Sequence, residues 1–129
     1  MSFQAINPPG PGIPGLSQAA AIDGGRLLLL SGHVPFRADG SVAGPDFEAQ
    51  LEQVFSNLAA TLKAAGSDFA QVAKLTYYIT DLQPDLLPTL RAVRDRFIDP
   101  AHPPASTLIG VAALFRPDVR VEIEAVATA

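Results

Sequence analysis

The clearest hydrophobic pattern lies near the C-terminus, where apolar and polar residues alternate over residues 119–127. Such alternation is typical of a β-strand with one buried face, because successive side chains of a strand point to opposite sides. Glu122 and Glu124 therefore share the face opposite the aliphatic row. A second apolar strand is predicted at residues 105–111, and the two strands are separated by a turn at residues 115–118.

Two segments have the three-to-four-residue apolar spacing of amphipathic helices, namely residues 46–65 and 86–98. Pro45 precedes the first helix and Gly66 provides a stop, as is common at helix ends. Pro88 falls in the first turn of the second helix, where a proline is tolerated.

Shorter apolar segments predict further strands at residues 2–6, 19–22, 26–31 and 69–80. Asp23-Gly24-Gly25 is typical of a tight turn, so residues 19–22 and 26–31 are expected to form a hairpin. The uniformly apolar segment 27–30 suits a strand that is buried on both faces. Residues 7–15, NPPGPGIPG, are expected to form an irregular loop, since prolines lack amide donors.

This order of elements predicts an α+β protein with two layers, in which two helices cover one face of a mixed sheet of about six strands. No helix remains to cover the other face. An apolar sheet face without a cover usually marks an interface, so a homo-oligomer is expected.

Composition narrows the class of protein. A chain of 129 residues, with 48% hydrophobic and 17% charged residues, suits a single globular domain over residues 1–129. The net charge of −4 and the scattered basic residues argue against binding of nucleic acid. The chain has no cysteine, which is compatible with the cytoplasm, and neither a membrane span nor a secretory signal is apparent.

Few residues suggest chemistry by themselves. The chain has no glycine-rich nucleotide motif, no nucleophile motif and no metal-ligand spacing, so neither a cofactor nor a metal is expected. Ser31-Gly32-His33 either presents backbone amides to an anion or only ends a strand. The two glutamates either line a site or form a solvated face, and Arg116 and Arg120 lie close enough in sequence to pair with them.

Taken together, five segments resemble the Rid family, also called YjgF: PGLSQAAAI, LLLLSGHVP, KLTYYITDL, PPASTLIGVAAL and DVRVEIEAVA. The resemblance extends from about residue 13 to residue 127, and its most specific parts are Ser31-Gly32, Pro104-Ala105 and residues 121–125. It implies a chorismate-mutase-like fold and a homotrimer whose sites lie in clefts between subunits.

The resemblance also implies a chemistry, the hydrolysis of reactive enamines and imines to a 2-keto acid and ammonia. By position, Glu122 is the residue that activates water, and Gly32 belongs to the substrate loop. Ser106 replaces the arginine that binds the substrate carboxylate, and Thr107 follows it in the same segment. Serine cannot form the charged fork of an arginine, a loss on the order of 2–5 kcal/mol.

Two further substitutions change the expected site: Leu16 stands where the family has a tyrosine, and His33 where it has a glutamine. One hypothesis is that His33 restores part of an anion or hydrogen-bond site, because it lies beside Gly32 and its imidazole can donate a hydrogen bond.

Three functions follow from these observations. The chain is expected to be a divergent deaminase that uses Glu122 and water on a small imine or enamine, without a cofactor. The alternative is a trimer that binds or senses a small metabolite without turnover. The third is a protein scaffold or a ribonuclease, and RNA cleavage is least favoured because the chain is acidic and lacks a basic groove and a catalytic pair of histidines.

Overall fold

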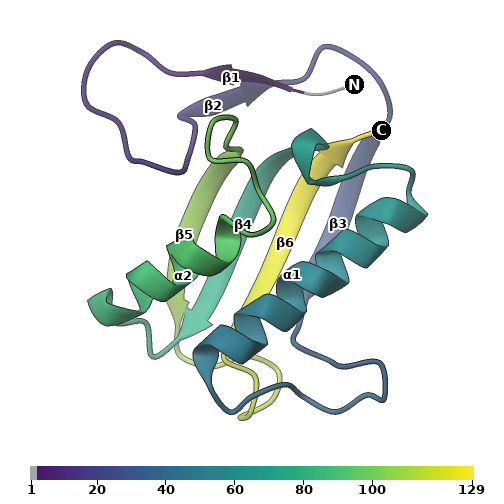
Figure 1. Ribbon diagram of the computed structural model, residues 1–129, viewed down its shortest axis with the longest axis vertical. Coiled ribbons are helices and arrows are strands. Elements are labelled where there is room, and N and C mark those ends of the chain that lie inside the picture. Colours follow the sequence, from purple (N-terminus) through teal and green to yellow (C-terminus); the bar gives the residue numbers. More distant parts are fainter. Residues whose placement is uncertain (1–2) are drawn as a thin grey trace.

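The computed structural model describes residues 3–129, and its main element is a four-stranded sheet with two helices on one face (Figure 1). The sheet contains β3 (Leu27–His33), β4 (Val72–Thr80), β5 (Ala105–Val111) and β6 (Val121–Thr128). The helices are α1 (Phe47–Ala64) and α2 (Leu87–Arg94). A separate two-stranded sheet pairs β1 (Gln4–Ile6) with β2 (Ala19–Ala21). The α+β class, the two layers and the mixed sheet are therefore confirmed, but the six strands form two sheets, of four and two strands, rather than one sheet of about six.

The strands of the main sheet lie in the order β3-β6-β4-β5. The last strand of the chain, β6, is antiparallel to both of its neighbours, whereas β4 and β5 are parallel. A parallel pair needs a crossover connection, and α2 lies in the segment that connects β4 to β5. The edge strands are thus β3 and β5, and β6 lies in the interior beside β4.

The core lies between the helices and the face of the sheet that they cover, which we call the helix face. The apolar stripe of α1 is buried, and its members are Phe47, Leu51, Val54, Phe55, Leu58 and Leu62. These side chains pack in one cluster with the inward rows of β4 and β6, namely Val72, Leu75, Tyr77, Ile79, Val121, Ile123, Ala125 and Ala127. The apolar residues of the alternating pattern that predicted β6 are therefore the buried residues of this strand.

The opposite face of the sheet, which we call the open face, has no helix over it (Figure 1). It is formed by Leu27, Leu29, Lys74, Thr76, Tyr78, Glu122, Glu124 and Val126. Leu29 is 76% exposed, so the expectation that residues 27–30 are buried on both faces does not hold within one chain. Only Leu30 among these four residues is buried.

The predicted hairpin around Asp23-Gly24-Gly25 is wrong. The strand β2 pairs with β1 rather than with β3, and the glycine loop connects the two sheets. The strand β3 pairs instead with β6, and just before it Arg26 exchanges both backbone hydrogen bonds with Ala129. A turn motif reports only a local reversal of the chain, so it could not reveal a partner about one hundred residues away.

The boundaries of several elements differ from the prediction, and Ser2 of the first predicted strand lies outside the described residues. The second helix is shorter than residues 86–98, because a 3-10 turn at Pro84–Leu86 precedes it and turns follow Arg94. Phe69–Gln71 forms a 3-10 turn rather than the start of β4. No helix in residues 3–129 is long and apolar enough to cross a membrane.

Candidate functional site

Glu122 lies on the open face against the backbone of Gly32. The register between β3 and β6 shifts between Leu30 and His33, so the backbone at Gly32 departs from the regular ladder. A Cβ atom placed on Gly32 would overlap the carboxylate of Glu122. Only a residue without a side chain therefore allows this approach. The need for glycine at position 32 comes from this close contact and not from an unusual backbone conformation.

The two glutamates of β6 have different surroundings. Glu124 accepts a hydrogen bond of 2.5 Å from the hydroxyl of Tyr78. This bond, followed by partial burial and the charges of both glutamates, raises the pKa of Tyr78. Glu122 has no hydrogen-bond or ion-pair partner within residues 3–129. Of the two carboxylates, Glu122 is the one that is free to receive a ligand or a water molecule.

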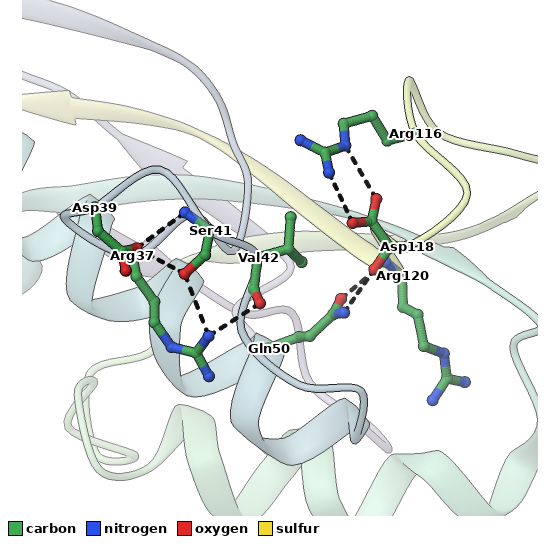
Figure 2. A network of polar contacts seen from close by, with 8 residues as sticks. All are labelled: Arg37, Asp39, Ser41, Val42, Gln50, Arg116, Asp118 and Arg120. Atoms are coloured by element: carbon green, nitrogen blue, oxygen red, sulfur yellow. Dashed lines mark hydrogen bonds and ion pairs between the residues drawn. The ribbon is translucent and has the colours of Figure 1, made fainter.

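Hydrogen bonds to backbone groups hold the strands that bear Gly32 and Glu122. Gln50, buried on α1, donates to the carbonyl of Asp118 at 2.7 Å and accepts from the amide of Arg120 at 2.8 Å (Figure 2). This fixes the start of β6 two residues before Glu122. Asn57 donates to two carbonyls in the loop after β3, those of Val34 and Phe36.

The predicted pairing of arginines with the two glutamates is wrong. Arg116 forms its ion pair with Asp118 at 2.8 Å (Figure 2). The guanidinium of Arg120 lies 5.4 Å from the centre of the Phe47 ring, on the side of α1. Both arginines are thus engaged elsewhere, and no ion pair within residues 3–129 neutralises Glu122.

His33 lies on the helix face, on the other side of the sheet from Glu122. Its backbone pairs with Ile123, whose side chain belongs to the core. The Nδ1 atom is 2.7 Å from the carbonyl of Ser31, and Nε2 is 2.7 Å from the hydroxyl of Thr61. Since a carbonyl only accepts, Nδ1 bears the proton of this bond. Both ring nitrogens are occupied, and the imidazole holds β3 on α1.

Ser106 lies on the helix face of the edge strand β5, beside α2. Its backbone pairs with Leu75 of the core row, whereas Thr107 pairs with Thr76 and faces the open side. Thr107 accepts a 2.6 Å hydrogen bond from Lys74. The serine lines a pocket of about 90 Å³, which we call the α2 pocket. Its lining residues are Ile13, Pro14, Leu16, Tyr77, Leu87, Leu90, Arg91, Arg94, Ser106 and Leu108.

Leu16 reaches this pocket because the segment before it is attached to the start of β5. Ser17 forms a parallel bridge with Ala105 and donates from its amide to the carbonyl of Pro104 at 3.0 Å. Its hydroxyl donates to the carbonyl of Pro103 at 2.5 Å. The proline-rich loop predicted at residues 7–15 is therefore closed onto the edge of the sheet at its C-terminal end.

The predicted site residues thus form two separate groups. Glu122 and Gly32 lie on the open face, while Leu16 and Ser106 line the α2 pocket on the helix face. β4 lies between β6 and β5, so the groups are separated by about 10 Å across the strands and by the thickness of the sheet. One chain does not bring them onto the same small molecule.

Three residues that line or support these groups were not predicted from the sequence: Gln50, Tyr77 and Arg94. Each has an apolar or amphipathic neighbourhood in sequence, and nothing local distinguishes Arg94 from the other arginines of the second helix. Residues 3–129 contain no cluster of three or more histidine, aspartate or glutamate side chains that could hold a metal ion. The chemistry available is therefore that of carboxylate, hydroxyl and guanidinium groups.

Comparison with known proteins gives matches over nearly the whole chain. The sequence profile of the family described as Endoribonuclease L-PSP matches residues 12–129. Protein DfrA from Myxococcus xanthus is 38% identical over 112 residues, which cover 86% of this chain and 82% of that protein. A 2-iminobutanoate/2-iminopropanoate deaminase from Salmonella typhimurium is 31% identical over 108 residues, which cover 82% of each chain.

The structural match is closer still. The crystal structure of YyfB from Yersinia pestis, a protein of unknown function of the conserved Rid protein family, superposes with a TM-score of 0.94. The two chains are 37% identical, and the superposition covers 100% of each. The family profile and the superposition on YyfB both include every residue of the two groups described above.

Proposed function

The chain belongs to the endoribonuclease L-PSP family, also called the Rid or YjgF family, and on this premise we propose that it hydrolyses small imines or enamines in clefts between subunits. The observation that supports this most is the carboxylate of Glu122, which is unpartnered within residues 3–129 and lies against Gly32. A relative that is 31% identical is named as a deaminase of 2-imino acids.

The proposed reaction needs one proton acceptor near water. Glu122 takes a proton from a water molecule while the oxygen adds to the carbon of the C=N bond. That proton passes to the imine nitrogen and gives a carbinolamine. As the C–N bond breaks, the proton of the new hydroxyl is transferred to the nitrogen, so ammonia leaves and the hydroxyl becomes a carbonyl group. An enamine enters the same route after its carbon gains a proton and its nitrogen loses one. No oxidant, metal or cofactor is needed for this balance.

The separation of the two residue groups supports an assembly of several chains. If both groups contact one substrate, they come from neighbouring subunits, because they face opposite sides of the sheet in one chain. The exposed leucines of the open face, Leu27 and Leu29, and Ile109 of β5 support burial of this surface in an interface. A homotrimer with a head-to-tail contact would bring the edge strand β5 of one chain beside the open face of the next.

A second candidate function is binding or sensing without turnover. The observation that favours it is Ser106, since the family's carboxylate-binding arginine is absent from that position. Both functions use the same cleft, and they differ in whether water attacks the bound molecule.

Ribonuclease activity is disfavoured by the surroundings of the two histidines. The His102 ring stacks on Phe3 at 4.2 Å, and His33 is bound to Thr61 of α1. The two imidazoles thus belong to different parts of the fold and form no acid–base pair. The net charge of −4 gives no attraction for a phosphate backbone.

The decisive experiment is a turnover assay with 2-aminoacrylate generated in the cuvette by a second enzyme. We expect the protein to release pyruvate and ammonia faster than the spontaneous reaction, and Glu122→Gln to lower the rate constant by about 10²- to 10⁴-fold. Glu124→Gln is the matched control, because its amide oxygen can still accept the hydrogen bond of Tyr78. No acceleration over the spontaneous rate, or equal rates for wild type and Glu122→Gln, would reject the proposal.

A further inference from the structure

An arginine from another element occupies the pocket beside Ser106. Arg94 is the last residue of α2, and its side chain is only 14% exposed. Its guanidinium lies so close to Gly15 that a Cβ atom at this glycine would overlap it. The fold therefore reserves space for this group in the α2 pocket, next to the position where the family has an arginine on β5.

The guanidinium of Arg94 is only partly satisfied by the protein. Its Nε atom donates to Asp95 at 3.1 Å, and the terminal nitrogens have no hydrogen-bond acceptor within residues 3–129. These nitrogens are not among the buried polar atoms of residues 3–129 that lack a partner, so they keep accessible surface and a ligand can reach them. Two parallel donors with this geometry match the two oxygens of a carboxylate.

Tyr77 gives an independent indication of a missing partner in the same pocket. The residue is 2% exposed and lines the pocket, and its hydroxyl has no hydrogen-bond partner within residues 3–129. Burial raises the pKa of Tyr77 well above its usual value, and the charge of Arg94 opposes this rise in part. The hydroxyl therefore keeps its proton at neutral pH and can donate a hydrogen bond.

We propose that Arg94 and the hydroxyl of Tyr77 bind the carboxylate of a small 2-imino or 2-keto acid, in place of the arginine that Ser106 replaces. This inference rests on the proposed function for the identity of the ligand. The volume of about 90 Å³ admits a carboxylate with a short chain and is well below that of pockets for drug-sized ligands. Leu16, Leu90 and Leu108 form apolar walls, which favour a short aliphatic substituent over a polar one.

Binding of pyruvate, a stable 2-keto acid, tests the inference by isothermal titration calorimetry on the full chain. Methyl pyruvate has nearly the same shape without the charge. We expect Arg94→Gln to raise the Kd of pyruvate by at least about 30-fold and to leave the Kd of methyl pyruvate within twofold. We expect Tyr77→Phe to raise the Kd of pyruvate by about tenfold. Arg96→Gln removes the same charge nearby, where Arg96 binds Glu48 and Glu52 on α1, and should change neither Kd.

A rescue variant separates ligand binding from support of the loop at Gly15. If Arg94 binds the carboxylate, adding Ser106→Arg to Arg94→Gln should restore most of the affinity for pyruvate. If Arg94 only supports the loop, Arg94→Gln should lower the Tm and weaken both probes equally, and Ser106→Arg should restore nothing. The inference is also overturned if wild type does not bind pyruvate at millimolar concentration, or if Arg94→Gln binds it within twofold of wild type.

The turnover assay shows which proposal fails. If the protein accelerates hydrolysis of 2-aminoacrylate and Arg94→Gln keeps the full kcat/KM, the proposed function stands and the inference fails. If pyruvate binding depends on Arg94 but hydrolysis is not accelerated, the inference stands and the proposed function fails.

Discussion

The helix face and the open face of the sheet alternate residue by residue along β6, yet their surroundings have little in common. Val121, Ile123 and Ala125 are fully or almost fully buried beneath the helices. Glu122 and Glu124, which lie between them, point to a face that no helix covers. One strand thus serves both as the centre of the core and as the support of a carboxylate.

This difference explains how an unpartnered acid can be held in place. The neighbours of Glu122 in sequence are fixed by aliphatic packing, and Gln50 fixes the start of the strand by two backbone hydrogen bonds. A reactive group on such a strand is more precisely positioned than one on a loop. The packing on the helix face therefore fixes the position of Glu122 on the open face, although the two faces have no side chain in common.

The largest effect is expected from a charge placed on the open face. Leu29→Asp would put an unpaired carboxylate into the proposed subunit interface, at a cost of about 3–5 kcal/mol for each copy. We expect the assembly to dissociate into folded single chains, because the Leu29 side chain is exposed within one chain. Light scattering after size-exclusion chromatography measures the mass, and circular dichroism checks the fold.

The matched change on the helix face is Leu58→Ala, which removes a fully buried side chain of α1. It should lower the free energy of unfolding by about 2–5 kcal/mol while the folded protein keeps its mass in solution. If Leu29→Asp left the mass unchanged, the open face would not be the interface. The two faces would then not differ in the way proposed here, with one forming the core and the other the subunit contact.

A smaller effect is expected at the contact between β3 and β6. Gly32→Ala adds a methyl group where the carboxylate of Glu122 lies, so the carboxylate must move. A displacement of about 1 Å can lower a rate by about 10²-fold, and the turnover assay would record this as a fall in kcat. The thermal unfolding of the variant should change little, since the added methyl group lies on the open face. Full activity of Gly32→Ala would show that the position of Glu122 is not critical.

The elements that depend on the periodic spacing of apolar residues could be predicted from the sequence. It predicted both helices, the two strands near the C-terminus and the face on which Glu122 lies. Buried positions recur at the period of the helix or strand that contains them, so they can be read from the sequence. The prediction failed for the hairpin at residues 23–25, where a local turn motif competes with a strand partner at the far end of the chain.

The candidate site could be predicted only in part. Resemblance indicated Glu122, Gly32, Ser106 and Leu16 by position, but it did not indicate that Arg94 and Tyr77 lie beside Ser106. Arg94 reaches the pocket because of how α2 crosses β5, a packing relation that leaves no local mark in the sequence. Nor could the pattern show that His33 faces α1, since that follows from the irregular register of β3.

The smallest effect, and the finest comparison of the two faces, concerns two adjacent tyrosines. Burial raises the pKa of Tyr77 on the helix face, and the hydrogen bond to Glu124 raises that of Tyr78 on the open face. In both cases the folded state holds the proton more tightly than the unfolded state. Stability is therefore complete below about pH 10, the usual tyrosine pKa, and falls as the pH rises above it.

For Tyr77 the fall should approach about 1.4 kcal/mol per pH unit, because one proton separates the two states. Tyr77→Phe should remove this slope, and it should not lower the stability at pH 7, since it deletes a hydroxyl that has no partner within residues 3–129. Tyr78→Phe should remove a smaller slope, because the phenol of Tyr78 is only partly buried and loses less hydration than that of Tyr77. Urea unfolding at pH 7, 10 and 11 measures all three proteins. If the two variants had equal slopes, water would reach Tyr77 on the helix face as readily as Tyr78 on the open face.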